Sequence, residues 1–202
     1  MVNERVQTPF GPAEFHLEQP AAGSSALVVL GHGAGGGIDA PDLVAVRDAV
    51  LTAGVAVARV SQPYRVAGRR APAPARQLDA AWIAVVDALR TRWDVALVVG
   101  GRSSGARVAC RTAGSVDASA VLALAFPVHP PGRPDKSRLD ELAVPTVPVL
   151  AVQGERDPFG CPPPAAGRTV VTVPGDHSLS RSAPAVGAAV VDFLRRLGLA
   201  AG

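Results

Sequence analysis

The sequence predicts an α/β protein with a mostly parallel, twisted β-sheet of about seven to eight strands and helices on both faces. Short apolar runs rich in Val, Leu and Ala recur along the chain without alternating with polar residues, as in strands that are covered on both faces. Longer segments with apolar residues at helical spacing lie between these runs. Because strands that alternate with helices form βαβ units, the sheet is expected to be parallel.

The apolar runs and the amphipathic segments give the predicted elements in order. The predicted strands are residues 27–30, 55–60, 95–99, 120–126, 147–152 and 169–173. The predicted helices are residues 41–53, 75–92, 104–113 and 184–197. The first helix has Pro41 in its first turn and ends before Gly54, as helices commonly begin and end. Residues 1–20 contain two short strand-like segments around a Pro-Phe-Gly-Pro turn and are expected to form an edge hairpin.

Length and composition indicate one globular domain that covers residues 1–202. The hydrophobic fraction is 48% and the charged fraction is 18%, which excludes a disordered chain. No apolar run is long enough for a membrane-spanning helix, and the first residues show no signal segment. We therefore expect a cytoplasmic protein that does not act at a membrane.

The basic residues and the cysteines do not indicate a binding site. The net charge is +3, and of the 20 basic residues only Lys136 is a lysine. The arginines are scattered and are not interleaved with aromatic residues, so nucleic acid is not an expected partner. Cys110 and Cys161 are far apart and form no paired-cysteine motif, which predicts neither a disulfide nor a metal site.

A G-x-S-x-G motif at residues 101–105 provides the candidate nucleophile, Ser103. It follows the predicted strand 95–99 and opens the predicted helix at Ser104. This strand–turn–helix setting is that of a nucleophile elbow, in which a strained turn projects the serine from the carboxyl edge of the sheet. The alternative is a tight strand–helix turn that happens to contain a serine.

A serine nucleophile needs a base, and the base needs an acid to orient it. His177 follows the last predicted strand and precedes the last helix, where such a base is expected. Asp157 follows the penultimate strand and is the candidate acid, with Glu155 and Asp176 as alternatives. The resulting order, Ser103, Asp157, His177, is the order of serine, acid and histidine in α/β-hydrolases.

Two backbone N–H groups are candidates for binding the oxyanion of the transition state. One is that of Ser104, at the positive end of its helix. The other is that of Ala34, with Gly33 as the alternative, in the glycine-rich loop 31–37. The glycines of this loop also fit the spacing of a dinucleotide-binding loop. However, the strand that follows lacks the expected acidic residue, and there is no phosphate-binding Gly-Lys-Ser/Thr sequence.

Five motifs, in order along the chain, resemble a known family: residues 32–36, 100–109, 126–132, 153–160 and 175–178. Together they resemble the small α/β-hydrolases related to dienelactone hydrolases. The most similar branch is named for a testis-expressed protein and a subunit of the NSL histone acetyltransferase complex. The resemblance covers roughly residues 25–197 and implies the α/β-hydrolase fold with a triad at Ser103, Asp157 and His177. Dienelactone hydrolases use a cysteine nucleophile, so the serine here does not imply their lactone chemistry.

Three further residues follow predicted strands at the same edge of the sheet and are candidates for contact with the substrate. They are His32, His129 and Arg69. The alternative for His129 is a loop that is only shaped by its prolines. The alternative for Arg69 is a solvated loop, since it lies in a basic run at residues 64–70 that could also bind an anionic group or a partner.

The predicted function is hydrolysis of a carboxylic ester or thioester through an acyl-enzyme on Ser103. Between the strands at 120–126 and 147–152 there is room for one short helix near residues 135–142, so no lid domain is expected and the site should be open. We expect a small-molecule acyl substrate, no cofactor, no metal, and a monomer or homodimer. The alternatives are a non-catalytic interaction module with this fold and an acyltransferase that uses the same residues.

Overall fold

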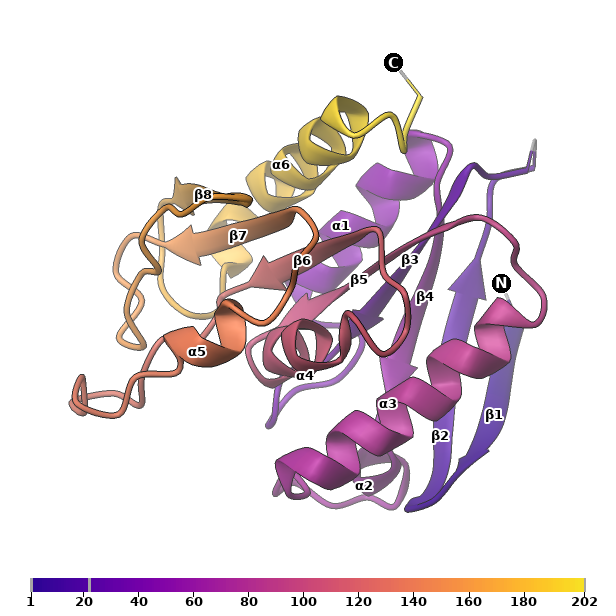
Figure 1. The fold of residues 1–202 in the computed structure, drawn as a ribbon, viewed down its shortest axis with the longest axis horizontal. Helices are drawn as coiled ribbons and strands as arrows, with labels where there is room; N and C mark the ends of the chain where they lie inside the picture. The colour runs from indigo at the N-terminus through magenta and orange to yellow at the C-terminus, as the bar shows by residue number, and fades with distance from the viewer. Residues whose placement is uncertain (1, 22, 202) are drawn as a thin grey trace.

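A twisted β-sheet forms the centre of the protein (Figure 1). The computed structural model describes residues 2–21 and 23–201, and within them the strands form one eight-stranded sheet in the order β1-β2-β4-β3-β5-β6-β7-β8. The strands are β1 (Val2–Thr8), β2 (Gly11–Glu18), β3 (Ala26–Gly31), β4 (Ala56–Ser61), β5 (Ala96–Arg102), β6 (Ala120–Leu124), β7 (Val149–Gly154) and β8 (Arg168–Val173). All neighbours from β4 to β8 pair in parallel, which confirms the predicted fold class.

Helices cover both faces of this sheet (Figure 1). They are α1 (Pro41–Thr52), α2 (Pro63–Val66), α3 (Ala75–Arg90), α4 (Ser104–Thr112), α5 (Leu139–Leu142) and α6 (Ala183–Arg196), with a 3₁₀ turn at Ser180–Ser182 before α6. Apolar side chains of α3 and α4 share one core with the sheet, and those of α1 and α6 share the other. The sheet is thus the middle layer of three.

The burial of β3 explains why the central strands read as continuous apolar runs. All six of its residues are buried. Leu27 and Val29 face the core under α3 and α4, whereas Val28 and Leu30 face the core under α1 and α6. Since successive side chains of a strand point to opposite faces, a strand that is covered on both faces is expected to be apolar at nearly every position.

The first two strands form the expected hairpin at one edge of the sheet. β1 and β2 pair antiparallel, and β2 continues antiparallel to β4. Burial alternates along β2, with Ala13, Phe15 and Leu17 in the core. The hairpin therefore extends the sheet beyond β4 and covers one side of the core.

The ends of most predicted elements shift by one to three residues, as in β5, which continues to Arg102, and three further segments differ from the sequence prediction. Residues 63–66, expected to lie in a loop, form the four-residue helix α2, which is too short to show helical periodicity. β6 ends at Leu124 rather than at residue 126, because Ala125 has a φ of 45°, outside the range of extended backbone. The short helix before β7 covers only Leu139–Leu142 rather than residues 135–142.

The segment between β6 and β7 forms no lid, as predicted. It contains the four-residue helix α5, and residues 131–137 are all exposed to solvent. This loop extends away from the body of the sheet (Figure 1). None of the helices within the described residues is long and apolar enough to span a membrane.

Candidate active site

Ser103 lies in a strained turn between β5 and α4. Its φ is 52° and its ψ is −107°, in a region that residues with a side chain rarely occupy. Its N–H donates a hydrogen bond to the carbonyl of Leu124, 2.9 Å away, which ties the turn to the end of β6. The surrounding hydrogen bonds thus hold a conformation that the isolated chain would avoid.

The glycines on either side of Ser103 allow β3 to approach the turn. A Cβ atom on Gly101 or on Gly105 would overlap the carbonyl oxygen of Gly31, at the end of β3. A Cβ atom on Gly100 would lie 2.6 Å from that of Leu122 on β6. The glycines of the motif are therefore required by the close packing of β3, β5, β6 and α4.

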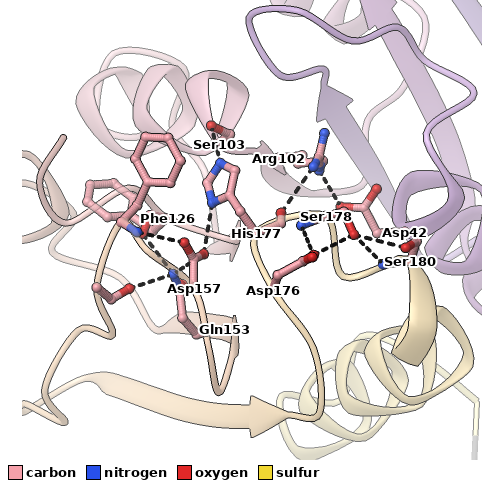
Figure 2. Close-up of polar contacts among 12 residues, drawn as sticks. Asp42, Arg102, Ser103, Phe126, Gln153, Asp157, Asp176, His177, Ser178 and Ser180 are labelled. Carbon is pink, nitrogen blue, oxygen red and sulfur yellow. Dashed lines mark hydrogen bonds and ion pairs between the residues drawn. The ribbon is translucent and has the colours of Figure 1, made fainter. Parts of the chain in front are cut away.

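His177 brings its imidazole ring against Ser103 from the loop between β8 and α6 (Figure 2). Its Nε2 lies 2.9 Å from Ser103 Oγ, and its Nδ1 lies 2.8 Å from Asp157 Oδ2. An ionised carboxylate only accepts hydrogen bonds, so with neutral His177 the ring proton lies on Nδ1. Nε2 is then the acceptor for the hydroxyl proton of Ser103.

The carboxylate of Asp157 is fully buried and held by two further donors. Its side chain is 0% exposed, compared with 19% for His177. The Phe159 N–H donates to Oδ1 at 2.8 Å, and the Gln153 side-chain amide donates to Oδ2 at 2.7 Å. The ring of Phe159 also stacks against that of His177, with 4.1 Å between the ring centres. These contacts fix both the carboxylate and the imidazole.

Gln153 is a residue of this site that the sequence analysis did not single out. It lies in β7 with 0% exposure, and its amide nitrogen also lies within hydrogen-bonding distance of the carbonyl oxygens of Phe126 and Gly160. These neighbours are all acceptors, so the nitrogen of the amide must face them. A polar residue at the end of an otherwise apolar strand, four positions before Asp157, was the available signal.

The two alternative acids do not contact His177 within the described residues. Glu155 is exposed. Asp176 accepts hydrogen bonds from the N–H of Ser178 at 2.9 Å and from its hydroxyl at 2.7 Å. These bonds lower the pKa of Asp176, and they tie its carboxylate to its own turn. The geometry therefore favours Asp157.

The glycine-rich loop after β3 lies beside Ser103. A Cβ atom on Gly33 would be 3.6 Å from Ser103 Cβ. The hydroxyl of Tyr64 donates to the carbonyl of Ala34 at 2.9 Å, which holds the next residue of the loop. Ser104 is the first residue of α4, so its N–H has no partner within the helix and is free to bind an anion.

His32 lies inside this loop rather than on its surface. The residue is 3% exposed; Nδ1 lies 2.8 Å from the carbonyl of Gly33, and Nε2 accepts the N–H of Gln62 at 3.1 Å. Burial lowers the pKa of His32 and favours its neutral form. Both ring nitrogens form hydrogen bonds with backbone groups of the protein, so the ring stabilises the loop and is not exposed for contact with a substrate.

The other two candidates for substrate contact occupy different surroundings. His129 is half-buried, and its ring packs against Gly160 in the loop that carries Asp157. Its N–H donates to the carbonyl of Phe159 at 3.1 Å, so it supports that loop. Arg69 is exposed and lines a cavity of about 90 Å³ together with Tyr64 and residues of α3.

A wide hollow lies away from these residues. It is an open groove of about 570 Å³ between α1 and α6, lined by small apolar residues together with Asp48, Asp192 and Arg195. A much smaller cavity behind the elbow is lined by Ser104, Gly105, His32 and Trp82. The candidate triad residues line neither of these hollows and lie at the carboxyl edge of the sheet.

Comparison with known proteins identifies the family. The sequence profile of the family described as an alpha/beta hydrolase domain matches residues 24–183. The chain belongs to this α/β-hydrolase family. This agrees with the predicted superfamily, whereas the assignment to a particular branch stays a prediction. No curated protein is similar to the chain in sequence.

Several solved structures share this fold at low sequence identity. A lidless α/β serine hydrolase from Xanthomonas campestris has a TM-score of 0.80 and 21% identity, over 97% of this chain and 94% of that one. Est1E from Butyrivibrio proteoclasticus has a TM-score of 0.77 and 18% identity, over 97% and 98%. A dienelactone hydrolase from Anabaena variabilis has a TM-score of 0.75 and 17% identity, over 96% of each chain.

Proposed function

We propose that this α/β-hydrolase is a serine hydrolase that cleaves carboxylic esters or thioesters through an acyl-enzyme on Ser103. The observation that carries the proposal is the continuous hydrogen-bonded series from Ser103 Oγ to His177 at 2.9 Å and from His177 to Asp157 at 2.8 Å, in a strained elbow (Figure 2). A turn that only connected a strand to a helix would need neither the strain nor a buried acid behind the histidine.

The proposed first half-reaction acylates Ser103. His177 Nε2 removes the hydroxyl proton as Oγ attacks the carbonyl carbon of the substrate. Asp157 stabilises the imidazolium that forms. The N–H groups of Ser104 and Ala34 bind the oxyanion, and the dipole of α4 adds to the first of them. The tetrahedral intermediate then collapses, and His177 gives its proton to the leaving alkoxide or thiolate.

The proposed second half-reaction uses the same groups with water as the nucleophile. His177 removes a proton from a water molecule that attacks the acyl carbon, and it then returns this proton to Ser103 Oγ as the acid product leaves. An alcohol or thiol in place of this water would make the protein an acyltransferase. Adding such acceptors to the assay and identifying the products separates these two outcomes.

The open edge supports a substrate whose acyl group is small, or large but exposed. The exposed loop 131–137 leaves the edge uncovered, and the cavity beside Arg69 holds only about 90 Å³. We assign Arg69 to the rim of the substrate site. Est1E, which shares the fold, has been observed with ferulic acid bound, so aromatic acyl esters belong among the substrates tested.

The proposal is tested with p-nitrophenyl esters and acyl thioesters of graded length, on the wild type and on Ser103→Ala. We expect the wild type to turn over the short esters and Ser103→Ala to lose this activity by several orders of magnitude, on the order of 10⁴-fold or more. A fluorophosphonate probe should label the wild type and not the variant. If both proteins label equally poorly while a control esterase reacts, the fold serves a non-catalytic role.

A further inference from the structure

The side chain of Arg102 connects the separate segments that meet at Ser103. Its Nη2 donates to the backbone carbonyl of His177 at 3.0 Å (Figure 2). A Cβ atom on Gly33 would lie 3.5 Å from its Nη1, and one on Gly36 would lie 3.8 Å away, so the guanidinium rests against the glycine-rich loop. Arg102, which directly precedes the nucleophile in the chain, therefore contacts both the histidine loop and the glycine-rich loop.

Asp42 pairs with this guanidinium by charge rather than by a hydrogen bond, since among the described residues neither its carboxylate oxygens nor Arg102 Nε has a hydrogen-bond partner. It lies in the first turn of α1 with a fully buried side chain, and its Oδ2 is 3.2 Å from Arg102 Nε (Figure 2). Among the described residues, Arg102 is the only side chain that forms an ion pair with Asp42. Burial raises the pKa of Asp42, and the charges of Arg102 and of a protonated His177 oppose this effect.

We propose that Arg102 and Asp42 form a positioning pair that holds the backbone of His177 and the glycine-rich loop in register with Ser103. This inference rests on the proposed function, because it assigns the pair to the same reaction. Neither residue reacts with the substrate. Arg102 acts through the carbonyl of His177, and Asp42 acts through Arg102.

The chemistry of the guanidinium explains why an arginine suits this place. Its donors point in fixed directions, so one group can bond the carbonyl of His177 while it compensates the charge of Asp42. The ion pair is costly to bury, since Asp42 is 0% exposed and Arg102 only 17% exposed. A buried ion pair of this kind is therefore weak evidence that it stabilises the fold. The contacts of Arg102 with the His177 carbonyl and the glycine-rich loop indicate that the pair positions these segments.

The test uses Arg102→Gln, Asp42→Asn and the double variant, with Arg90→Gln as the control. Arg90 pairs with the exposed Asp117, outside the site. We expect kcat for a p-nitrophenyl ester to fall by about 100-fold in each single variant, with KM changed much less, because a displaced histidine affects the reaction more than binding. The double variant should lose about as much as either single variant, since the two residues act as a unit. The control should match the wild type.

Proton NMR tests the position of His177 in the absence of substrate. The Nδ1-bound proton of His177, which faces Asp157, should give a low-field proton signal in the wild type and in Arg90→Gln. This signal should broaden or disappear in Arg102→Gln and Asp42→Asn, while circular dichroism shows that both remain folded. If Arg102→Gln does not fold, Asp42→Asn, which keeps the size of the side chain, carries the test.

Two results would overturn the proposal. One is a pair of folded variants with wild-type kcat and an unchanged low-field signal. The other is a double variant whose loss equals the product of the two single losses, which would show that the residues act separately. A wild-type protein that cleaves no ester contradicts the proposed function, whereas the low-field signal still decides whether the pair positions His177.

Discussion

At the residue scale, the elbow depends on the absence of a side chain at Gly105. Alanine there would overlap the carbonyl oxygen of Gly31, a backbone atom that cannot move without shifting β3. Alanine is intrinsically better than glycine in a helix by up to about 1 kcal/mol. We nevertheless expect Gly105→Ala to lower the free energy of unfolding by roughly 1–3 kcal/mol, because the overlap outweighs the helix preference.

Urea denaturation checks this prediction, with Gly114→Ala as the matched control. A Cβ atom on Gly114, just after α4, meets no atom within 4 Å. The control should leave the free energy of unfolding unchanged or slightly raised. A Gly105→Ala variant as stable as the wild type would mean that the approach of β3 to α4 is not tight.

Because His32 is buried, we expect the free energy of unfolding to depend on pH. Its Nε2 accepts the N–H of Gln62, so a proton on this nitrogen would place two donors face to face. Burial lowers the pKa of His32 below its ordinary value of 6.5, so the unfolded chain binds a proton more readily than the folded protein. This contribution to stability is present above pH 6.5 and is lost as the pH falls through 6.5 towards the pKa of the folded state.

The measurement compares free energies of unfolding between pH 5 and 8 for the wild type and His32→Gln. The variant cannot titrate at this position, so its stability should depend less on pH across this interval. The other histidines are the same in both proteins and cancel in the comparison. Parallel curves for the two proteins would show that His32 tolerates a proton in the folded state.

At the element scale, a network of ion pairs fastens α4 to α3 and α5. Arg111 on α4 pairs with Asp79 on α3 at 2.6 Å and with Glu141 on α5 at 2.7 Å. Arg107, one turn earlier on α4, also bonds Glu141, with 2.8 Å from its Nε to the carboxylate. Burial would raise the pKa of Glu141, but the bonds from the two arginines lower it. Because α4 begins directly after Ser103, the network also steadies the elbow.

We expect Arg111→Met to lower the free energy of unfolding by about 1–3 kcal/mol. The loss is smaller than for a fully buried pair, because these side chains are 18–22% exposed and partly screened by solvent. Arg90→Met, which removes a pair to the 99% exposed Asp117, is the control and should cause a small change. Thermal or urea unfolding measures both, and equal losses would show that the network contributes no more than a surface pair.

Most of the strands and longer helices could be predicted from the sequence. The strands that are covered on both faces and the helices of three or more turns were recognisable, because burial imposes their apolar patterns. The helix α2 was not predicted, because four residues are too few to show a helical period of apolar residues. Ser103, His177 and Asp157 follow strands that end at one edge, so their convergence was foreseeable. The contacts of Arg102 with His177 and Asp42 join segments far apart in the chain, and residue spacing carries no information about them.

At the scale of the whole molecule, the site occupies the edge of the sheet where the strands β3, β5, β7 and β8 end. Parallel strands bring their carboxyl ends to one edge, so the glycine-rich loop, the elbow, the acid loop and the histidine loop meet there (Figure 1). Between β6 and β7 the chain adds only α5 and the exposed residues 131–137. No element of the described chain is therefore placed to close over Ser103.

An uncovered site predicts the absence of interfacial activation. An enzyme whose site is closed by a lid gains activity when a lipid surface opens it, whereas here there is no such conformational step to trigger. With p-nitrophenyl butyrate, the rate should rise hyperbolically and pass through the solubility limit of the ester without a jump. The rate on dispersed long-chain esters should not exceed that on dissolved short ones, because the open edge offers little enclosed apolar surface for a long chain. A sharp increase in rate at the solubility limit would mean that a segment of the chain covers Ser103 in solution.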